Sequence, residues 1–336
     1  MNEGVRSGTA PESIDDTWLG EPPLALYLHL PWCVRKCPYC DFNSHELRGA
    51  LPADEYVAAL LSDLELELPL VWGRVVSSVF LGGGTPSLFR ADQVECLLSG
   101  IRSRVVLAPD AEITLEANPG TVEHDSFAAY RAAGVNRVSL GVQSFDDTLL
   151  QRIGRIHGRA EALAALESLA GSGIDNYNLD LMYALPGQTA AQAVEDVRTA
   201  LSCAPPHVSH YQLTIEPNTY FHAHRPETPD DELAWSMQDR CTRLLDAAGL
   251  DVYEISARAR PGRACRHNMN YWRYGDFIGL GAGAHGKISL PARQAGRRTI
   301  RRRHPRDWME AAGTPEALAE ERELPPAERI FEFFLN

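Results

Sequence analysis

Hydrophobic and polar positions follow two alternating patterns along this chain. Residues 24–30 (LALYLHL) form a short apolar run typical of a buried strand, whereas residues 52–68 repeat apolar side chains at helical spacing. The same order of strand and helix recurs to residue 249. Further strands are expected at 75–84, 112–119, 137–144, 176–186 and 207–217, and further helices at 90–101, 123–134, 159–173, 189–201 and 231–249.

About six strand–helix units joined by short connections predict an α/β fold, with a parallel sheet covered by helices. Right-handed crossovers curl such a sheet toward a full or partial barrel. We therefore expect a partial (β/α)6 TIM-like barrel over residues 24–250. A doubly wound open sheet is the alternative that this pattern leaves open.

Both flanks of this region lack the pattern. Residues 1–23 are polar, contain Gly and Pro and have no period, which predicts a disordered tail. Residues 251–336 are rich in Gly, aromatic side chains and turns, and predict a smaller C-terminal region. Residues 325–336 (PPAERIFEFFLN) form an apolar helical segment without a polar cap, so we expect this region to be truncated.

The composition narrows the classes of function. Of the 336 residues, 44% are hydrophobic and 23% are charged, which is ordinary for a globular protein. The formal net charge of −13 argues against a nucleic-acid binder. The sequence contains no run of about 18 apolar residues and therefore predicts no membrane helix. Residues 1–23 also contain no apolar signal core, so we expect a cytoplasmic location. Clustered cysteines in that compartment more often bind metal or do redox chemistry than form disulfides.

Three of the seven cysteines, Cys33, Cys37 and Cys40, lie together directly after the first expected strand. Structural zinc usually takes four ligands, and ordinary electron-transfer clusters use four cysteines. Three thiolates can instead hold three irons of a [4Fe–4S] cluster and leave the fourth iron open to a ligand. A zinc site completed by the distant Cys265, and three free thiols, are the alternatives.

Other segments of unusual chemistry fall where the expected strands end, on the rim that carries the active site in barrels. Residues 82–86 (GGGTP) form a turn whose glycines allow the backbone to approach a ligand closely. A polar side chain buried at an apolar strand end needs a hydrogen-bond partner. Four such side chains follow on successive strand ends and can together surround a zwitterion: Glu116, Gln143, Arg155 and Asp180.

The cysteine spacing, with the aromatic Tyr39 directly before the third cysteine, resembles the radical S-adenosylmethionine (SAM) superfamily. This resemblance implies that the open iron binds the amino and carboxylate groups of SAM. It also implies that an electron donor reduces the cluster, which then cleaves SAM to methionine and a 5'-deoxyadenosyl radical. The fold that it implies is a partial or full α/β barrel.

From about Leu24 to the end of the chain, the order of these motifs is similar to the oxygen-independent coproporphyrinogen III oxidase family and its HemW-type haem chaperone branch. In that family the matching positions contact SAM. The resemblance therefore implies SAM contacts from Tyr27, Tyr39, Gly83, Gly84, Thr85, Glu116, Gln143, Arg155 and Asp180.

Two features are similar to the chaperone branch rather than to the oxidase branch. The oxidase branch usually carries a further cysteine two residues after the third, where this chain has Phe42. Residues 267–272 (HNMNYW) match the H-N-x-x-Y-W motif associated with haem binding in the chaperone branch. The resemblance makes His267 the expected haem ligand, since an imidazole can ligate haem iron. A hydrogen-bonded loop histidine is the alternative.

We therefore expect a chaperone that binds haem and a SAM-ligated [4Fe–4S] cluster and delivers haem to acceptor proteins. Oxidative decarboxylation of coproporphyrinogen III is the alternative function, and SAM cleavage is left open. The expected partners are haem, haem-acceptor proteins and an electron donor, with membrane contact only through partners and no nucleic acid.

Two further segments receive weaker interpretations. The arginines at 301–303 can attract propionates or an acidic partner, but a solvated loop is the interpretation favoured by such a run of charge. Residues 277–287 (FIGLGAGAHGK) are expected to form a Gly-rich turn near the mouth of the barrel.

Overall fold

The computed structural model describes residues 21–121, 126–290 and 295–335. Most of the expected N-terminal tail, residues 1–20, lies outside the described residues. Within the ranges that are described, no helix is both long enough and apolar enough to cross a membrane.

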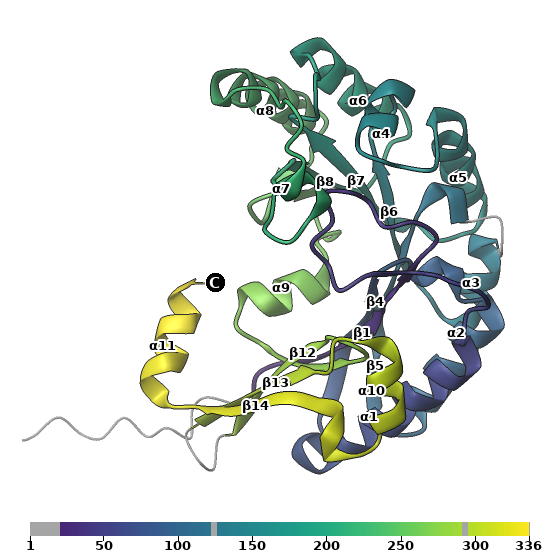
Figure 1. Ribbon diagram of the computed structural model, residues 1–336, viewed down its shortest axis with the longest axis vertical. Helices are drawn as coiled ribbons and strands as arrows, with labels where there is room; N and C mark the ends of the chain where they lie inside the picture. Colours follow the sequence, from purple (N-terminus) through teal and green to yellow (C-terminus); the bar gives the residue numbers. More distant parts are fainter. Residues whose placement is uncertain (1–20, 122–125, 291–294, 336) are drawn as a thin grey trace, which may run out of the picture.

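A sheet of twelve strands organises the described chain (Figure 1). Its six central strands are parallel and neighbour one another in chain order: β1 (Leu24–Leu30), β4 (Val75–Gly83), β5 (Val106–Ala117), β6 (Arg137–Gln143), β7 (Asn176–Tyr183) and β8 (His207–Gln212). A doubly wound sheet would reverse its strand order at a switch point, and this series does not reverse. The prediction of a partial (β/α)6 barrel is confirmed.

The helices that connect these strands lie on the outer, convex side of the curved sheet (Figure 1). The main ones are α1 (Ala53–Val71), α2 (Ala91–Arg102), α3 (Phe127–Ala133), α5 (Arg159–Gly171), α6 (Ala190–Ser202) and α8 (Asp231–Ala247). Shorter turns sit at the strand ends: η2 (Pro86–Leu88), η3 (Pro119–Thr121), α4 (Asp147–Arg152) and α7 (Tyr220–Ala223). All six expected helices are present.

One strand is longer than its sequence pattern indicates. β5 begins at Val106, whereas the apolar pattern predicts a start at residue 112. The added segment contains Pro109 and Asp110, residue types that are depleted in strands. Its pairing with β4 shifts register between Val76 and Ser78, so the early part of β5 is an irregular and largely exposed extension.

The sheet continues beyond residue 250. β11 (Asp276–Leu280) pairs in parallel with β1, and an antiparallel series follows it: β12 (His285–Leu290), β13 (Ala295–Arg301) and β14 (Leu318–Leu324). At the opposite edge, β10 (Ala257–Ala259) and β9 (Asp251–Val252) extend the sheet from β8. The remaining elements are α9 (Arg266–Trp272), α10 (Pro305–Ala311), η5 (Pro315–Ala317) and α11 (Pro326–Leu335). The last strands of the chain therefore flank the first strand of the barrel.

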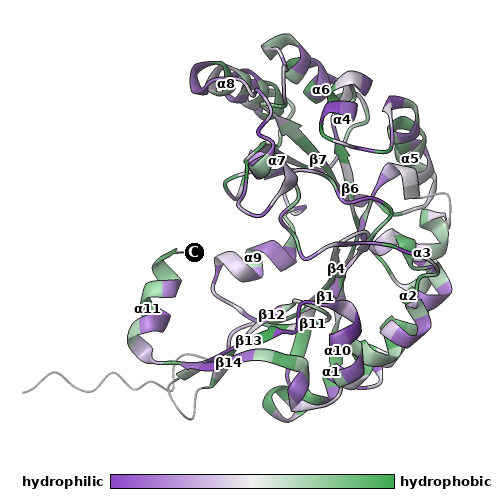
Figure 2. Cartoon of the chain, in the orientation of Figure 1, coloured by the Kyte–Doolittle hydropathy of each residue, from purple (hydrophilic) through white to green (hydrophobic). Residues whose placement is uncertain are grey.

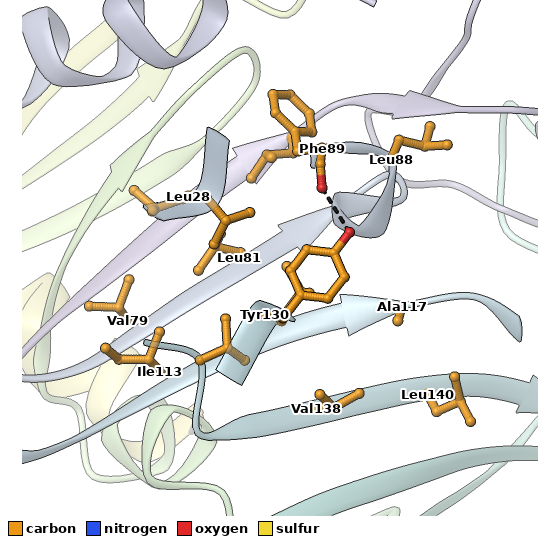
Figure 3. Close-up of a cluster of buried hydrophobic side chains, with 14 of the residues drawn as sticks. Leu28, Val79, Leu81, Leu88, Phe89, Ile113, Ala117, Tyr130, Val138 and Leu140 are labelled. Carbon is orange, nitrogen blue, oxygen red and sulfur yellow. Dashed lines mark hydrogen bonds between the residues drawn. The ribbon is translucent and has the colours of Figure 1, made fainter. Parts of the chain in front are cut away.

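A buried apolar cluster between the sheet and the outer helices holds the strands in place (Figure 3). Leu28, Leu81 and Val138 contribute from three different strands and are fully buried. The Tyr130 hydroxyl, on α3, donates to the carbonyl of Phe89 at 2.8 Å, so the polar end of this buried ring is satisfied. This core fixes the positions of the strand ends on which the candidate site is built.

The interpretation of the arginine run at 301–303 as a solvated loop is wrong for its first member, whereas Arg302 and Arg303 are exposed and follow the end of β13. Arg301 is the last residue of β13 and is 1% exposed. Its guanidinium donates to Asp63 at 3.1 Å and to Glu67 at 2.7 Å, both on α1. Strand alternation places Arg301 against α1, a contact between distant segments that charge counting along the sequence does not show.

The C-terminal segment forms the expected apolar helix. In Figure 2, α11 carries hydrophobic and hydrophilic bands along its length. Its apolar side chains are exposed in the described structure: Ile330, Phe331, Phe333, Phe334 and Leu335.

Candidate cluster site and adjoining cavity

The three clustered cysteines lie in a loop that leaves β1 at the rim of the barrel. Two short strands, β2 (Trp32–Cys33) and β3 (His45–Glu46), pair across its base. The Lys36 ammonium donates to the carbonyls of Phe42 (3.0 Å) and Ser44 (3.1 Å), which folds the loop back on itself. All three thiols are half-buried and line one cavity of about 340 Å³.

This first cavity gathers nearly the whole predicted site. Besides the three cysteines, it is lined by every predicted SAM contact except Tyr27. These residues come from the C-terminal parts of successive parallel strands or from the segments that follow them, which meet at one rim of a barrel. The structure therefore brings together side chains that lie more than 140 positions apart along the chain, from Cys33 to Asp180.

Two carboxyl groups in the first cavity are strongly affected by burial. The Gly83 N–H donates to Glu116 at 3.0 Å, and burial, followed by the nearby Asp180, raises the pKa of Glu116 to about 7. Burial also raises the pKa of Asp180, which accepts hydrogen bonds from Ser139 (3.1 Å) and Asn178 (2.7 Å). Both groups are acceptors suited to the amino or hydroxyl groups of a ligand.

Arg155 links the cavity to the cysteine loop. One terminal nitrogen donates to the Cys37 sulfur at 3.7 Å, and the other donates to Asn118 and to the carbonyl of Gly141. Its Nε is buried and has no hydrogen-bond partner among the described residues. Because buried donors are normally paired, an acceptor supplied by a ligand would satisfy it.

Gln143 ends β6 in the left-handed region, with φ of 68°. Its side-chain oxygen accepts from the Tyr211 hydroxyl at 2.7 Å. A non-glycine residue in this conformation is strained and is found disproportionately at ligand sites. The sequence analysis missed Tyr211 and Asn118 as cavity residues, although both stand near the ends of expected strands.

The chemistry of this cavity fits an iron–sulfur cluster with SAM as its ligand. Three soft thiols face a common space that also carries the unpaired Arg155 donor and two carboxyl groups. Burial raises the pKa of the Cys33 and Cys40 thiols, so metal binding must displace their protons. Within the described ranges, no three His, Cys, Asp or Glu side chains converge on a position for one metal ion. Cys265, the proposed fourth ligand of a zinc site, is instead buried beside Glu112 and does not line this cavity.

A second cavity, of about 320 Å³, adjoins the first, and Gly83, Glu116 and Phe42 line both. Tyr27 lines this second cavity and not the one lined by the cysteines, and its contact with SAM stays a prediction. Its hydroxyl donates to His29 Nδ1 at 3.0 Å, while His29 Nε2 donates to the carbonyl of Asn43 at 3.0 Å.

His267 lies behind the wall of the second cavity and does not line either cavity. It is 2% exposed, and its ring lies 5.0 Å from that of Phe80 and 5.1 Å from that of Tyr271. Ser78 Oγ is 3.2 Å from Nδ1, and Nε2 has no hydrogen-bond partner among the described residues. Burial lowers the pKa of His267 to about 3. Ligation of haem iron by His267 stays a prediction, and it requires the aromatic wall in front of it to move.

Comparisons with known proteins identify the family of the chain. The model of the radical SAM superfamily matches residues 27–200. The heme chaperone HemW of Escherichia coli is 52% identical over 94% of this chain and 82% of its own length, and that of Haemophilus influenzae is 47% identical over the same shares. A mitochondrial radical S-adenosyl methionine domain-containing protein 1 from Bos taurus is 39% identical over 86% of this chain and 67% of its own length.

Among solved structures, the radical SAM enzyme coproporphyrinogen III oxidase (HemN) of Escherichia coli superposes with a TM-score of 0.81. It covers 95% of this chain and 76% of its own, at 24% sequence identity, so the likeness concerns the fold. The superfamily match spans more than half of the chain, and the HemW relatives match it along most of their length. The chain belongs to the radical SAM superfamily and, within it, to the HemW family.

Proposed function

We propose that this protein is a haem chaperone, which binds haem beside a SAM-ligated [4Fe–4S] cluster and passes it to acceptor proteins. The observation that carries the proposal is the pair of adjoining cavities, one lined by thiols and charged groups and the other by aromatic side chains. The names of the HemW relatives point in the same direction. A cytoplasmic location and a separate electron donor are part of the proposal.

In this proposal the first cavity serves the cluster and SAM. Cys33, Cys37 and Cys40 hold three irons, and the cluster supplies an electron-transfer centre with one iron open to SAM. The arginine that donates to Cys37 stabilises negative charge on that sulfur, because a charge-assisted hydrogen bond favours the thiolate. The polar groups that face SAM are Gly83, Gly84, Thr85, Glu116, Gln143, Arg155 and Asp180.

Haem delivery is favoured over coproporphyrinogen oxidation by the residue at position 42. In the oxidase branch this position usually carries a thiol, whereas here the Phe42 ring stands 59% exposed and lines both cavities. An exposed aromatic ring offers a porphyrin an apolar face. It offers no thiol for redox chemistry.

Two measurements on one anaerobically reconstituted sample test the proposal. Ferric haem added to the full chain should bind with a saturable change in the Soret band. Coproporphyrinogen III, SAM and a reductant should give no protoporphyrinogen. Absence of saturable haem binding, or formation of protoporphyrinogen, would contradict the proposal. The variant His267→Ala tests the predicted ligand, since unchanged haem affinity and spectrum would rule out ligation by His267.

A further inference from the structure

We propose that the second cavity is the haem site, with His285 as the imidazole that ligates the haem iron and Arg303 as the cation that pairs with a haem propionate. This inference rests on the proposed function, because it names the site at which that cargo binds. It also assigns a role to two segments whose chemistry was left open, the Gly-rich segment 277–287 and the arginine run.

His285 is the accessible imidazole of the second cavity. It is the first residue of β12 and is exposed, and neither ring nitrogen has a hydrogen-bond partner among the described residues. Partial burial, followed by the nearby Arg298 and Arg303, lowers the pKa of His285, which favours the neutral form that binds metal. A free, neutral imidazole on a cavity wall is suited to ligate iron.

Two other histidines at or behind the wall of this cavity are less suited to this role. His29 also lines the cavity, but Tyr27 and the carbonyl of Asn43 occupy both of its nitrogens. His267 has one free nitrogen, but its ring lies behind those of Tyr27 and Tyr271, which form the wall. His285 therefore differs from both neighbours in combining free nitrogens with exposure to the cavity.

The three consecutive arginines have three different environments. Arg301 is buried in ion pairs with α1, and Arg302 donates to the carbonyl of Glu316. Arg303 lines the second cavity, and its guanidinium has no carboxylate partner in the described part of the chain. Guanidinium pairs with carboxylates in two-pronged geometry, so a propionate would provide the missing partner.

Aromatic side chains supply the apolar part of this cavity. Phe42, Tyr271 and Phe277 line it, and the rings of the last two are 4.4 Å apart. Porphyrins are broad apolar planes, and aromatic faces bury such surfaces well. The cavity thus presents an imidazole, a guanidinium and aromatic rings, the three kinds of group that a haem with its propionates requires.

Asn43 holds these parts of the cavity together. Its side-chain amide donates to the carbonyl of Ala282 at 2.9 Å and to that of Arg303 at 2.8 Å. Gly283 has φ of 79°, and a Cβ at this position would collide with the same amide. The glycine turn before His285 is therefore packed against the loop that carries the cysteines, which places the proposed haem site directly beside the cluster site.

Haem titrations of the full chain test the ligand assignment. We expect His285→Ala to weaken binding of ferric haem at least tenfold and to change the Soret band, while the surface control His224→Ala leaves both unchanged. His285→Met should replace the nitrogen ligand with a thioether sulfur, an alternative haem ligand, and shift the spectrum accordingly. Retention of iron–sulfur absorbance in each variant shows that the chain is folded.

Titrations with a second probe test Arg303. Arg303→Ala should weaken binding of haem several-fold but leave binding of haem dimethyl ester, whose propionates carry no charge, unchanged. Arg306→Ala, which removes an exposed arginine paired with Glu310, is the matched control. If the wild type binds haem while both His285 variants keep its affinity and spectrum, the site assignment is overturned and the chaperone function stands. If the wild type binds no haem, the proposed function itself fails.

Discussion

The two adjoining cavities are built in different ways. Residues of the first come from consecutive strand ends, from the loop after β1 to the end of β8, and many of them already hold one another through hydrogen bonds. The second is closed by elements from both ends of the barrel region, with β1 on one side and α9, β11 and β12 on the other. The His285 imidazole and the Arg303 guanidinium, which line it, have no hydrogen-bond partner among the described residues. The first cavity is thus organised to hold a resident cofactor, and the second keeps groups available for a cargo.

The largest effect is expected when one cysteine is removed, which tests whether the two cavities act separately. Cys37→Ala should abolish iron–sulfur absorbance after reconstitution, because two thiols cannot hold the cluster as three do. Haem binding should remain within about threefold of the wild type, since the second cavity contains none of the cysteines. Cys96→Ala, which removes an exposed thiol away from the loop, is the control. Loss of haem binding together with the cluster would show that the two sites do not act separately.

The different construction of the cavities also explains how much the sequence could predict. The repeated strand–helix pattern places Glu116, Gln143 and Asp180 on one rim, because parallel strands of a barrel end at the same face. The repeated strand–helix pattern is therefore enough to predict which of these side chains line the first cavity. Tyr27 is the exception, because it stands in the middle of β1 rather than at its end, and the second cavity that it lines is formed only when β11 pairs with β1.

The second cavity depends on a long-range pairing. The placement of His285 follows from β11 pairing in parallel with β1, a contact between segments about 250 residues apart. The Gly-rich stretch before His285 has no helical or alternating period, so the sequence predicts only a turn there. Likewise, Arg303 cannot be distinguished from Arg301 by composition, since only strand position decides which of them faces α1.

Glu116 lines both cavities, and its substitution should have an effect of intermediate size, on the stability of the fold rather than on ligand binding. The pKa of Glu116 is raised from 4.5 to about 7, so the folded state binds its proton more tightly than the unfolded state does. Its ionisation therefore lowers the free energy of unfolding as the pH rises from about 4.5 to about 7, and the loss is complete above that range. Glu116→Gln should remove this loss and stabilise the apoprotein by about 1–3 kcal/mol at pH 8, allowing for solvent that enters the cavities.

Urea unfolding of the apoprotein at several pH values measures this effect. The difference between Glu116→Gln and the wild type should shrink toward zero well below pH 4.5, where the carboxyl is protonated in both the folded and the unfolded state. The exposed Glu95→Gln is the control and should show no such pH-dependent gain. A Glu116→Gln variant that is less stable than the wild type at pH 8 would mean that the carboxylate is stabilised in the fold, contrary to the direction of its pKa.

The smallest expected effect comes from the residue that joins the second cavity to the cysteine loop. Asn43→Ala removes two hydrogen bonds, each contributing about 1 kcal/mol, and frees the glycine turn that positions His285. Haem affinity should fall several-fold while iron–sulfur absorbance stays intact, because Asn43 does not line the first cavity. Asn43→Asp retains an oxygen but not the donating amide, and should behave like the alanine variant. Normal haem affinity in both variants would show that the turn holds His285 without this anchor.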